Sequence, residues 1–337
     1  MAKKIAIMGA GSWGTALAVS LSHAGHQVNM WDINAEHIAE MRANRENKRY
    51  LPGVMFEDAL HVVDTAEEAI GGADIVLFSA PAQHFRSALQ SAMPYLTPDM
   101  VLVNVAKGIE QKTLLRLSQV AKEYVPEAKY VVLSGPSHAE EVGRLMPTTV
   151  VCASEDLALA EYVQDVFMTE NLRIYTNNDV AGVEFGGALK NIIALGAGIS
   201  DGMGYGDNAK AALMTRGMTE MSRLGVALGA KEETFAGLTG MGDLIVTCTS
   251  MHSRNRRCGI MIGEGVDPAE ATKRVGMVVE GMYTAEAAYQ LAQQVGVEMP
   301  ITEAIYGVIN GKVDARAAVK ALMTRQRKHE KEDISVK

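Results

Sequence analysis

The stretch Lys4-Ile-Ala-Ile-Met-Gly-Ala-Gly-Ser-Trp-Gly14 decides the fold of this chain. A short apolar run leads into three glycines, Gly9, Gly11 and Gly14, which have the spacing G-x-G-x-x-G, and an Ala- and Leu-rich segment follows. This order predicts a strand, a tight turn and a helix whose first N–H groups and partial positive charge suit a diphosphate. The spacing alone is a weak signal, because any tight turn from strand to helix favours glycine. The flanking strand and helix patterns make a dinucleotide-binding turn the better interpretation.

A second predicted strand, Gln27–Trp31, follows the helix and ends at Asp32. An acidic residue about 20 positions beyond such glycines is where a ribose 2′-hydroxyl is held. We therefore expect Asp32 to complete the cofactor site that begins at the glycine-rich turn.

Composition limits the class of protein. A chain of 337 residues favours two domains. The net charge of −8, from 32 basic and 40 acidic residues, argues against a nucleic-acid or membrane-surface binder but leaves room for a small anionic substrate at a local basic pocket. Three cysteines without C-x-x-C spacing predict neither disulfides nor a metal site. With no leader pattern and no apolar run near ~18 residues, we expect a cytoplasmic protein without a membrane span.

Strand-like runs alternate with helical stretches up to about residue 176. Several of these runs are continuously apolar, as in strands covered on both faces, so the pattern predicts a Rossmann-like, doubly wound and mostly parallel sheet. After the first two strands the expected runs are 60–63, 74–79, 101–105, 130–133, 148–152 and 172–175. From residue 179, where a long helix is expected to follow Asn177 and Asn178, helical spacing dominates. We predict a dinucleotide-binding domain over residues 1–178 and an all-α substrate domain over residues 179–337.

Two segments after predicted strands carry polar candidates. Lys107 follows the strand that ends near Val105, and side chains at the carboxyl ends of parallel strands face the ligand crevice, so we favour a ligand contact over a surface cation. Ser137 and Glu140 have the spacing of a capping box at a helix start, which is compatible with an anion site. His138 lies between them, and a surface position is the better interpretation for it.

Lys190 lies in an apolar, glycine-rich helical segment, which is unusual for a solvated face. Its stem could pack while its amine reaches water. Alternatively, the amine is partly desolvated and its pKa is lowered. The small residues before it predict a close-packed neighbour or a ligand against this helix.

A glycine-rich segment contains Asp243 and Thr247, and the run Ser253–Arg257 follows it with three arginines within four residues. Arginine forks beside hydroxyl and amide donors suit a phosphate or a carboxylate. A salt-bridged helix face is the alternative, and the neighbouring Asp243 and Thr247 favour the anion site.

Taken together, these motifs resemble those of bacterial-type NAD(P)-dependent glycerol-3-phosphate dehydrogenases. The resemblance extends from residue 9 to about residue 302, and the ordered set of motifs is highly specific. The matching segments are GAGSWGTALA (9–18), NKRYLPG (47–53), NVAKG (104–108), SGPSHAEE (134–141), ALKNIIALGAGISDG (188–202), LMTRG (213–217), TGMGDLIVTCTS (239–250), SRNRR (253–257) and VVEG (278–281).

The resemblance implies roles for the matching residues. Lys190 is the implied proton acceptor, and Lys107, Asp243 and Thr247 arrange the reacting carbinol. Implied substrate contacts also include Gly135, Ser137, Ser253, Arg254 and Asn255, with Arg254 and Asn255 chiefly on the phosphate. Implied dinucleotide contacts, besides the turn glycines and Asp32, are Ser12, Trp13, Lys107, Ala139, Arg254, Val278 and Glu280. The family further implies a Rossmann-type domain with an all-α domain, a homodimer, and glycerol 3-phosphate made for phospholipid synthesis.

Asp32 and Ile33 depart from the pattern of NADP-using relatives, which commonly place a small residue before Arg or His there. A carboxylate accepts ribose hydroxyls but repels a 2′-phosphate, so we expect NAD(H) to be preferred to NADP(H). For Lys190 to act as a base near neutral pH its pKa must be lowered by about three units. Burial, the charge of Lys107 and an oxidised nicotinamide would lower it, whereas Asp243 would raise it and is better interpreted as a hydrogen-bonding anchor.

Two other functions compete with this hypothesis. A related hydroxyacid dehydrogenase would use Arg254 to hold a carboxylate. A non-catalytic redox sensor would need a docking or DNA-binding module, which the sequence does not indicate, and would leave Lys190, Asp243 and Arg254 without a role.

Overall fold

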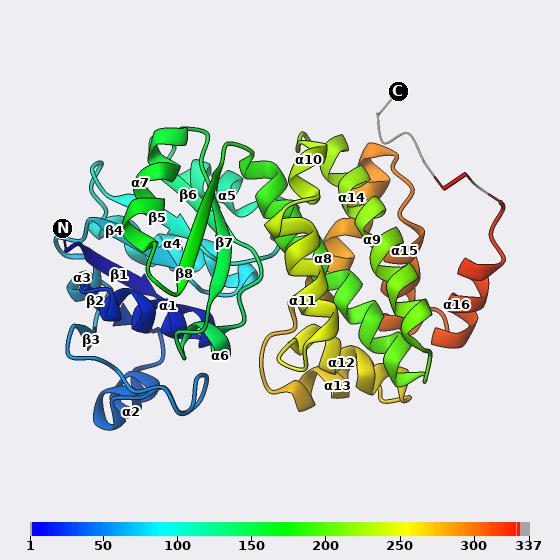
Figure 1. The fold of residues 1–337 in the computed structure, drawn as a ribbon, viewed down its shortest axis with the longest axis horizontal. Helices are drawn as coiled ribbons and strands as arrows, with labels where there is room; N and C mark the ends of the chain where they lie inside the picture. The colour runs from blue at the N-terminus through cyan, green and yellow to red at the C-terminus, as the bar shows by residue number, and fades with distance from the viewer. Residues whose placement is uncertain (1, 328, 331–337) are drawn as a thin grey trace. The chain divides into compact units, whose positions relative to one another are not determined.

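The structure is a computed structural model that describes residues 2–327, 329 and 330. It consists of two compact units (Figure 1). The first comprises Met1–Ala106 and Leu117–Val180, and the second comprises Lys107–Arg116 and Ala181–Lys337. The chain therefore passes between the units three times. Lys107–Arg116, hereafter the crossing segment, belongs to the second unit although it lies within the range that the sequence assigns to the first domain.

The first unit contains an eight-stranded sheet of order β3-β2-β1-β4-β5-β6-β7-β8. Neighbouring strands are parallel except β6 and β7, which are antiparallel, so the predicted doubly wound and mostly parallel sheet is confirmed. The strands are β1 (Lys4–Met8), β2 (Gln27–Trp31), β3 (Leu60–Val62), β4 (Ile75–Phe78), β5 (Val101–Asn104), β6 (Lys129–Ser134), β7 (Thr148–Ala153) and β8 (Leu172–Asn177).

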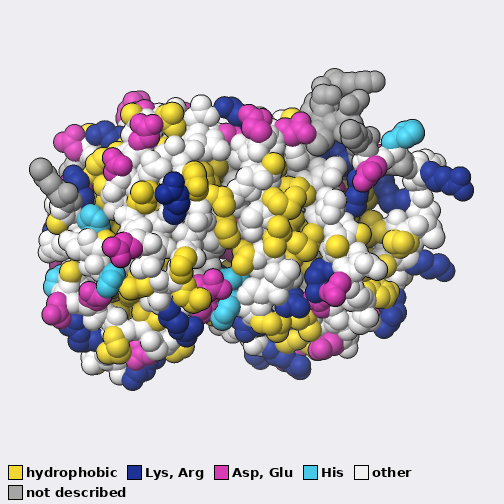
Figure 2. Space-filling view, in the orientation of Figure 1, with side chains coloured by type: hydrophobic (Ala, Val, Ile, Leu, Met, Phe, Trp, Pro, Cys, Tyr) yellow, Lys and Arg dark blue, Asp and Glu magenta, His cyan; other side chains and the backbone are white. Residues whose placement is uncertain are grey.

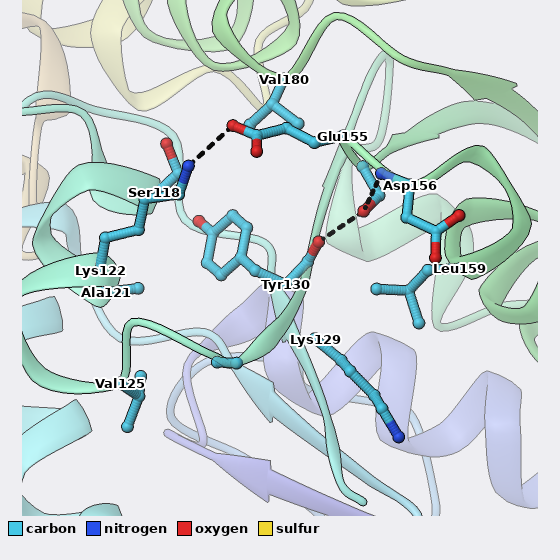
Figure 3. Close-up of a pocket in the computed structure, with 12 residues that line it drawn as sticks. Ser118, Ala121, Lys122, Val125, Lys129, Tyr130, Glu155, Asp156, Leu159 and Val180 are labelled. Carbon is cyan, nitrogen blue, oxygen red and sulfur yellow. Dashed lines mark hydrogen bonds and ion pairs between the residues drawn. The ribbon is translucent and has the colours of Figure 1, made fainter. Parts of the chain in front are cut away.

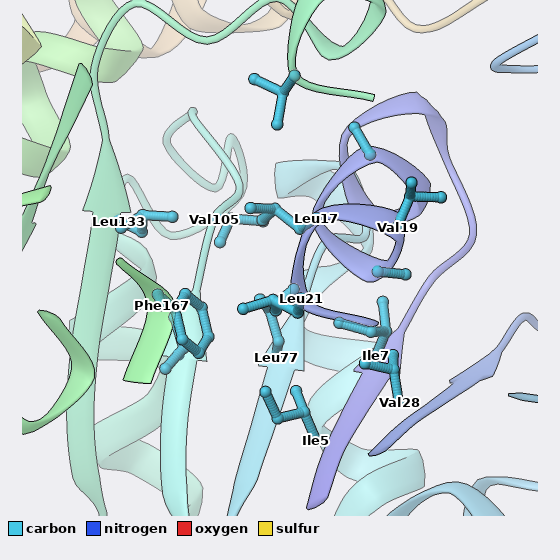
Figure 4. Packing of buried hydrophobic residues seen from close by; sticks show 14 of the residues in the cluster. Ile5, Ile7, Leu17, Val19, Leu21, Val28, Leu77, Val105, Leu133 and Phe167 are labelled. Carbon is cyan, nitrogen blue, oxygen red and sulfur yellow. The ribbon is translucent and has the colours of Figure 1, made fainter. Parts of the chain in front are cut away.

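The core of the first unit explains the continuously apolar strand runs. Ile5 and Ile7 of β1 and Leu77 of β4 are fully buried, and Leu17 and Leu21 of α1 pack in the same cluster (Figure 4). Residues on both faces of these strands are buried because helices and loops cover the sheet. The helices are α1 (Ser12–His23), α2 (Ala35–Asn44), α3 (Ala66–Ile70), η1 (Ala82–His84), α4 (Phe85–Ala92), η2 (Met93–Tyr95), α5 (Leu117–Tyr124), α6 (Ala139–Val142) and α7 (Leu157–Phe167).

The second unit is helical, as predicted, and forms around α8 (Val180–Gly202). By length and composition α8 could cross a membrane, but 94% of its most apolar window is buried inside the protein, as in a core helix. The other elements are α9 (Asp207–Ala227), α10 (Glu232–Phe235), the π-helical turn η3 (Leu238–Gly242), α11 (Asp243–Thr249), α12 (Arg254–Gly263), α13 (Pro268–Val275), α14 (Glu280–Val295), α15 (Pro300–Ile309) and α16 (Ala315–Met323).

The crossing segment is fastened to the helices of the second unit. Its Arg116 forms an ion pair with Glu184 of α8 at 2.7 Å, with both side chains largely buried. Gln111 donates to a carboxylate oxygen of Glu286 in α14 at 2.8 Å, and Ile109 is buried in the second core. These contacts, which the sequence does not reveal, make Lys107 part of the helical unit.

Candidate active site

The three glycines of the turn have different structural roles. Gly9 has a φ of +108°, which a residue with a side chain rarely adopts. A Cβ on Gly14 would overlap the carbonyl oxygen of Gly9 and the hydroxyl of Ser79, so this glycine lets α1 pack closely on the end of the sheet. A Cβ on Gly11, the N-cap of α1, would meet no atom within 4 Å. The backbone at Gly11 is therefore open to a ligand, which is the role of the second glycine in a dinucleotide turn.

Asp32 and Asn47 hold this turn in place. One carboxylate oxygen of Asp32 accepts from the backbone N–H of Ala10 at 2.8 Å, and the other accepts from Asn34 N–H at 3.0 Å. Asn47 is fully buried, and its Nδ2 donates to the Ala10 carbonyl and to the Thr15 hydroxyl, both at 2.8 Å. Asn47 begins the NKRYLPG motif, but nothing local in the sequence indicates that it supports a turn 37 residues away.

These residues fit a dinucleotide. The space at Gly11 and the start of α1 at Ser12 suit a diphosphate, because no side chain caps the N–H groups of this helix. Asp32 is only partly buried, and each of its oxygens can accept a further hydrogen bond from a ribose hydroxyl. Trp13 is partly buried in the same turn, and its Nε1–H has no acceptor within the described part of the chain.

The predicted capping box after β6 is wrong. Ser137 Oγ donates to the Gly135 carbonyl at 2.9 Å, and α6 begins at Ala139 with His138, not Ser137, as its N-cap and without a side-chain cap hydrogen bond. The reason is the backbone at Gly135, whose φ is +130° and where a Cβ would lie 3.0 Å from Val150 Cα. The Ser137 hydroxyl closes this sharp turn. Gly135, Ser137 and Ala139 still lie together beyond the end of β6.

Four predicted catalytic residues meet in the second unit. Lys190 Nζ lies 2.9 Å from one oxygen of Asp243 and 2.8 Å from Thr247 Oγ1. Lys107 Nζ lies 2.8 Å from the other oxygen of Asp243. One carboxylate is thus shared between two ammonium groups. Lys190, Asp243 and Thr247 are at most 6% exposed, whereas the side chain of Lys107 is 16% exposed.

Burial and charge set the protonation of this cluster. Burial lowers the pKa of Lys190 to about 8; Asp243 opposes this change, and the charge of Lys107 reinforces it. Burial tends to raise the pKa of Asp243, but the two ammonium groups outweigh it and hold that pKa below its usual value. Burial raises the pKa of the neighbouring Cys248 thiol to about 12, so this cysteine is not a thiolate nucleophile near neutral pH.

Local backbone structure places the cluster. A Cβ on Gly186 would lie 2.9 Å from the Thr239 carbonyl oxygen, so the small residue lets the η3 turn approach α8, as the sequence predicts for a close-packed neighbour. The π-helical turn ends at Gly242, and α11 begins at Asp243. Thr247 lies one turn later, where its hydroxyl donates to the Asp243 carbonyl at 2.6 Å and accepts from Lys190.

Two asparagines connect this cluster to the start of α12. Asn191, which follows Lys190, contacts the Lys107 carbonyl through Nδ2 at 3.4 Å. Its Oδ1 accepts from Asn255 Nδ2 at 2.9 Å, and Asn255 Oδ1 accepts from the Gly281 N–H at 2.8 Å. Asn255 is therefore largely committed to protein contacts. The link places Arg254, adjacent to Asn255, near the α14 start, where Val278 precedes the helix and Glu280 opens it.

The arginine cluster has divided functions. Ser253 caps α12 by accepting from the Arg256 N–H at 3.1 Å. The Arg256 guanidinium is bound to Asp201, with its Nη2 2.7 Å from the carboxylate, so the salt-bridged alternative holds for this residue. Arg256 is consequently not available to an anion, and the basic site predicted from three arginines is smaller than the sequence suggests.

The first unit also contains a cavity of ≈ 270 Å³, away from the glycine-rich turn (Figure 3). Tyr130 and an ion pair between Lys122 and Glu155, at 2.8 Å, line it. None of the residues predicted for the active site lines this cavity. On the surface, basic and acidic side chains are interspersed over the face in Figure 2.

A doubly wound sheet with a dinucleotide turn, in one chain with a buried lysine held by a carboxylate and a hydroxyl, defines a nicotinamide-dependent dehydrogenase. The family models described as the N- and C-terminus of NAD-dependent glycerol-3-phosphate dehydrogenase match residues 4–160 and 179–320. The chain belongs to this family, as its motifs predict.

Individual relatives are similar to this chain over nearly their whole length. A glycerol-3-phosphate dehydrogenase (NAD(P)+) from Pelotomaculum thermopropionicum is 54% identical, with 100% of this chain and 97% of that protein covered. One from Moorella thermoacetica is 55% identical, with 98% and 99% covered. The crystal structure of a glycerol-3-phosphate dehydrogenase from Coxiella burnetii superposes with a TM-score of 0.93 at 38% identity, covering 96% of this chain and 99% of that one.

Proposed function

We propose that the protein interconverts sn-glycerol 3-phosphate and dihydroxyacetone phosphate by hydride transfer, with NAD(H) preferred to NADP(H) as the carrier. Family membership over nearly the whole chain supports the activity. The observation that carries the proposal is the setting of Lys190, a buried lysine with a lowered pKa and two fixed partners.

Lys190 has the hydrogen bonds that a proton-transfer group needs. A neutral amine can donate its two N–H groups to Asp243 and Thr247, which leaves its lone pair to take the proton of the C2 hydroxyl. In the reverse direction the ammonium form donates its third proton to the C2 oxygen. A pKa of about 8 keeps both forms accessible near neutral pH. The bound nicotinamide supplies or accepts the hydride.

Asp243 and Lys107 position the groups that take part in this proton transfer. Asp243 orients the Lys190 amine and balances one of the two positive charges. Lys107 is the more exposed of the two lysines, and we assign it to the substrate carbinol oxygen and the cofactor. Thr247 fixes the second N–H of Lys190, so its removal would let the amine rotate.

Phosphate recognition is assigned to the start of α12. Arg254, Ser253 and one remaining N–H of Asn255 are donors at a helix N-terminus, a setting that favours an anion. Gly135 and Ser137 of the first unit are assigned to the substrate as well. For the dinucleotide we assign Gly9, Gly11, Ser12, Trp13, Gly14, Asp32, Lys107, Ala139, Arg254, Val278 and Glu280.

The proposal is tested by adding dihydroxyacetone phosphate to the purified protein and NADH and following the oxidation of NADH. Rapid turnover with this substrate and little with small 2-keto acids is expected. Faster turnover of a 2-keto acid would support the rival hydroxyacid dehydrogenase, in which Arg254 holds a carboxylate. In the same assay Arg254→Ala should raise the KM for dihydroxyacetone phosphate strongly and affect unphosphorylated dihydroxyacetone less.

Cofactor choice is tested by comparing kcat/KM for NADH and NADPH. The Asp32 carboxylate, fixed by the Ala10 and Asn34 amides, should repel a 2′-phosphate. Comparable efficiencies with the two cofactors would contradict the preference.

In the cell we assign the protein to the cytoplasm, as a homodimer that supplies glycerol 3-phosphate for phospholipid synthesis. Membership in the family supports this role. Sedimentation measures the oligomeric state. Restoration of phospholipid synthesis by added glycerol 3-phosphate in a depleted strain tests whether the enzyme supplies this precursor.

A further inference from the structure

A second shared carboxylate lies in the helical unit, apart from the Lys190 cluster. Asp201, in the eleventh position after Lys190 along α8, bonds Arg256 through Nε at 2.9 Å and Nη2 at 2.7 Å. Its other oxygen lies 2.8 Å from Lys210 Nζ of α9. The side chains of Asp201, Arg256 and Lys210 are 14%, 13% and 17% exposed. In the sequence, Asp201 belongs to the segment ALKNIIALGAGISDG (188–202), and the pattern assigns it no role.

Arg256 connects the elements that carry the proposed site. Its Nη1 donates to the Thr249 carbonyl at 3.1 Å, at the end of α11, the helix that carries Asp243 and Thr247. Its backbone N–H donates to Ser253 Oγ and so closes the cap of α12. One side chain thus ties α8, α11 and α12 together within two residues of Arg254.

The backbone of α12 packs directly against that of α8. A Cβ on Gly198 of α8 would overlap the Arg256 carbonyl oxygen, and one on Gly259 of α12 would overlap the Leu195 carbonyl oxygen. The two helices therefore touch along their backbones. This contact sets their separation. The rotation of α12 is restrained by the Asn255–Asn191 hydrogen bond and by Asp201, one oxygen of which binds both Nε and Nη2 of the planar Arg256 guanidinium.

We infer that Asp201, acting through Arg256, is a positioning residue for the substrate phosphate. This inference rests on the proposed function and concerns the orientation of Arg254 and Ser253, since both oxygens of Asp201 are already bound by Arg256 and Lys210. Asp201 also offsets positive charge two residues from Arg254, and it is shared between Arg256 and Lys210. Without it, Arg256 would be a largely buried charge lacking its partner, able to swing out and pull the start of α12 with it.

The test compares Asp201→Asn with the wild-type enzyme on two substrates, dihydroxyacetone phosphate and dihydroxyacetone, at saturating NADH. We expect the KM for the phosphorylated substrate to rise by roughly tenfold to a hundredfold, because small misplacements of a binding group cost this much, while kcat is largely kept. The kcat/KM for dihydroxyacetone should be nearly unchanged, since it lacks the phosphate. Arg256→Lys, which keeps the charge but loses the fork, should show a smaller rise of the same kind.

Arg274→Gln is the matched control. It removes another arginine of the helical unit, paired with Glu270 on exposed α13 at 2.8 Å, and should leave both substrates unaffected. A wild-type KM in Asp201→Asn, or equal losses on both substrates, would overturn the inference. If Asp201→Asn does not fold, Arg256→Lys decides in the same way. An inactive wild-type enzyme would instead overturn the proposed function, and the inference with it.

Discussion

Replacing Lys107 by Met should change the pH at which the enzyme works. Lys107 and Lys190 bond to different oxygens of Asp243, and the charge of Lys107 helps to keep the pKa of Lys190 at about 8. Reduction of dihydroxyacetone phosphate needs Lys190 in its ammonium form, so wild-type kcat should fall as the pH rises through about 8. Without Lys107 the ammonium form of Lys190 persists to higher pH, and the falling limb should move upward.

The size of this pH shift follows from the repulsion between Lys107 and Lys190, which bind the two oxygens of the same carboxylate. Two unit charges roughly 5 Å apart at an effective dielectric constant of about 20 repel by about 3 kcal/mol, a factor of roughly a hundred in proton affinity. The falling limb should therefore move from about pH 8 toward about pH 10 in Lys107→Met. The absolute rate should also decrease, because Lys107 is assigned to the substrate, but this loss does not affect the position of the limb.

The assay is kcat for NADH oxidation as a function of pH, with saturating dihydroxyacetone phosphate. Lys107→Arg keeps a positive charge and should leave the limb near its wild-type position. Lys112→Met removes an exposed lysine of the same crossing segment and should not move it. A limb that stays in place in Lys107→Met, or that moves to lower pH, would refute the reasoning that Lys190 is the acid and that Lys107 tunes it.

Three further predictions concern other parts of the chain. Lys190→Met should lower kcat at least about a hundredfold while NADH affinity, measured by fluorescence titration, stays near wild type, and near-normal turnover would exclude Lys190 as the base. Gly11→Ala should weaken NADH binding without lowering the melting temperature, because a Cβ there meets no protein atom within 4 Å, whereas Gly14→Ala should lower the melting temperature by overlapping the Gly9 carbonyl oxygen; the opposite pattern would contradict these glycine roles. Burial raises the pKa of Glu220, which accepts from the Ile301 N–H at 2.7 Å, to about 7. Its contribution to stability should be complete below about pH 4.5 and lost as the pH rises through about 7, and Glu220→Gln should abolish this loss in urea unfolding.

Local patterns were sufficient to predict the strands and the glycine-rich turn of the first unit. The apolar runs predict the strands because both faces of a doubly wound sheet are covered. The G-x-G-x-x-G spacing predicts the turn because Gly9 has a positive φ and Gly14 has no room for a Cβ, while Gly11 leaves the backbone open to a ligand. The prediction of a capping box at Ser137 was wrong because it, too, used only a local pattern. A capping box assumes that the helix begins directly after the serine, but the positive φ of Gly135 uses the hydroxyl to close a turn first.

Long-range contacts could not be predicted in the same way. Asn47 supports a turn 37 residues away, and Arg116 anchors the crossing segment to Glu184, 68 residues away. Neither pair has a spacing that a helix or strand period would generate. Only the structure shows that Lys107, which follows a strand of the sheet, belongs to the helical unit with Asp243.

The arginine run at the start of α12 shows why composition is a poor guide to charge at a site. From the sequence, three arginines within four residues in a chain of net charge −8 indicate a local basic site for an anion, with a salt-bridged helix face as the alternative. In the folded unit Asp201, 55 residues before Arg256, neutralises that arginine. An arginine that is bound to a partly buried carboxylate contributes to the shape of a site more than to its attraction for an anion, because its donors are already used. Specificity for a phosphate then depends on how accurately the fold positions Arg254. The number of arginines in the run is larger than the number of positive charges available to bind the substrate.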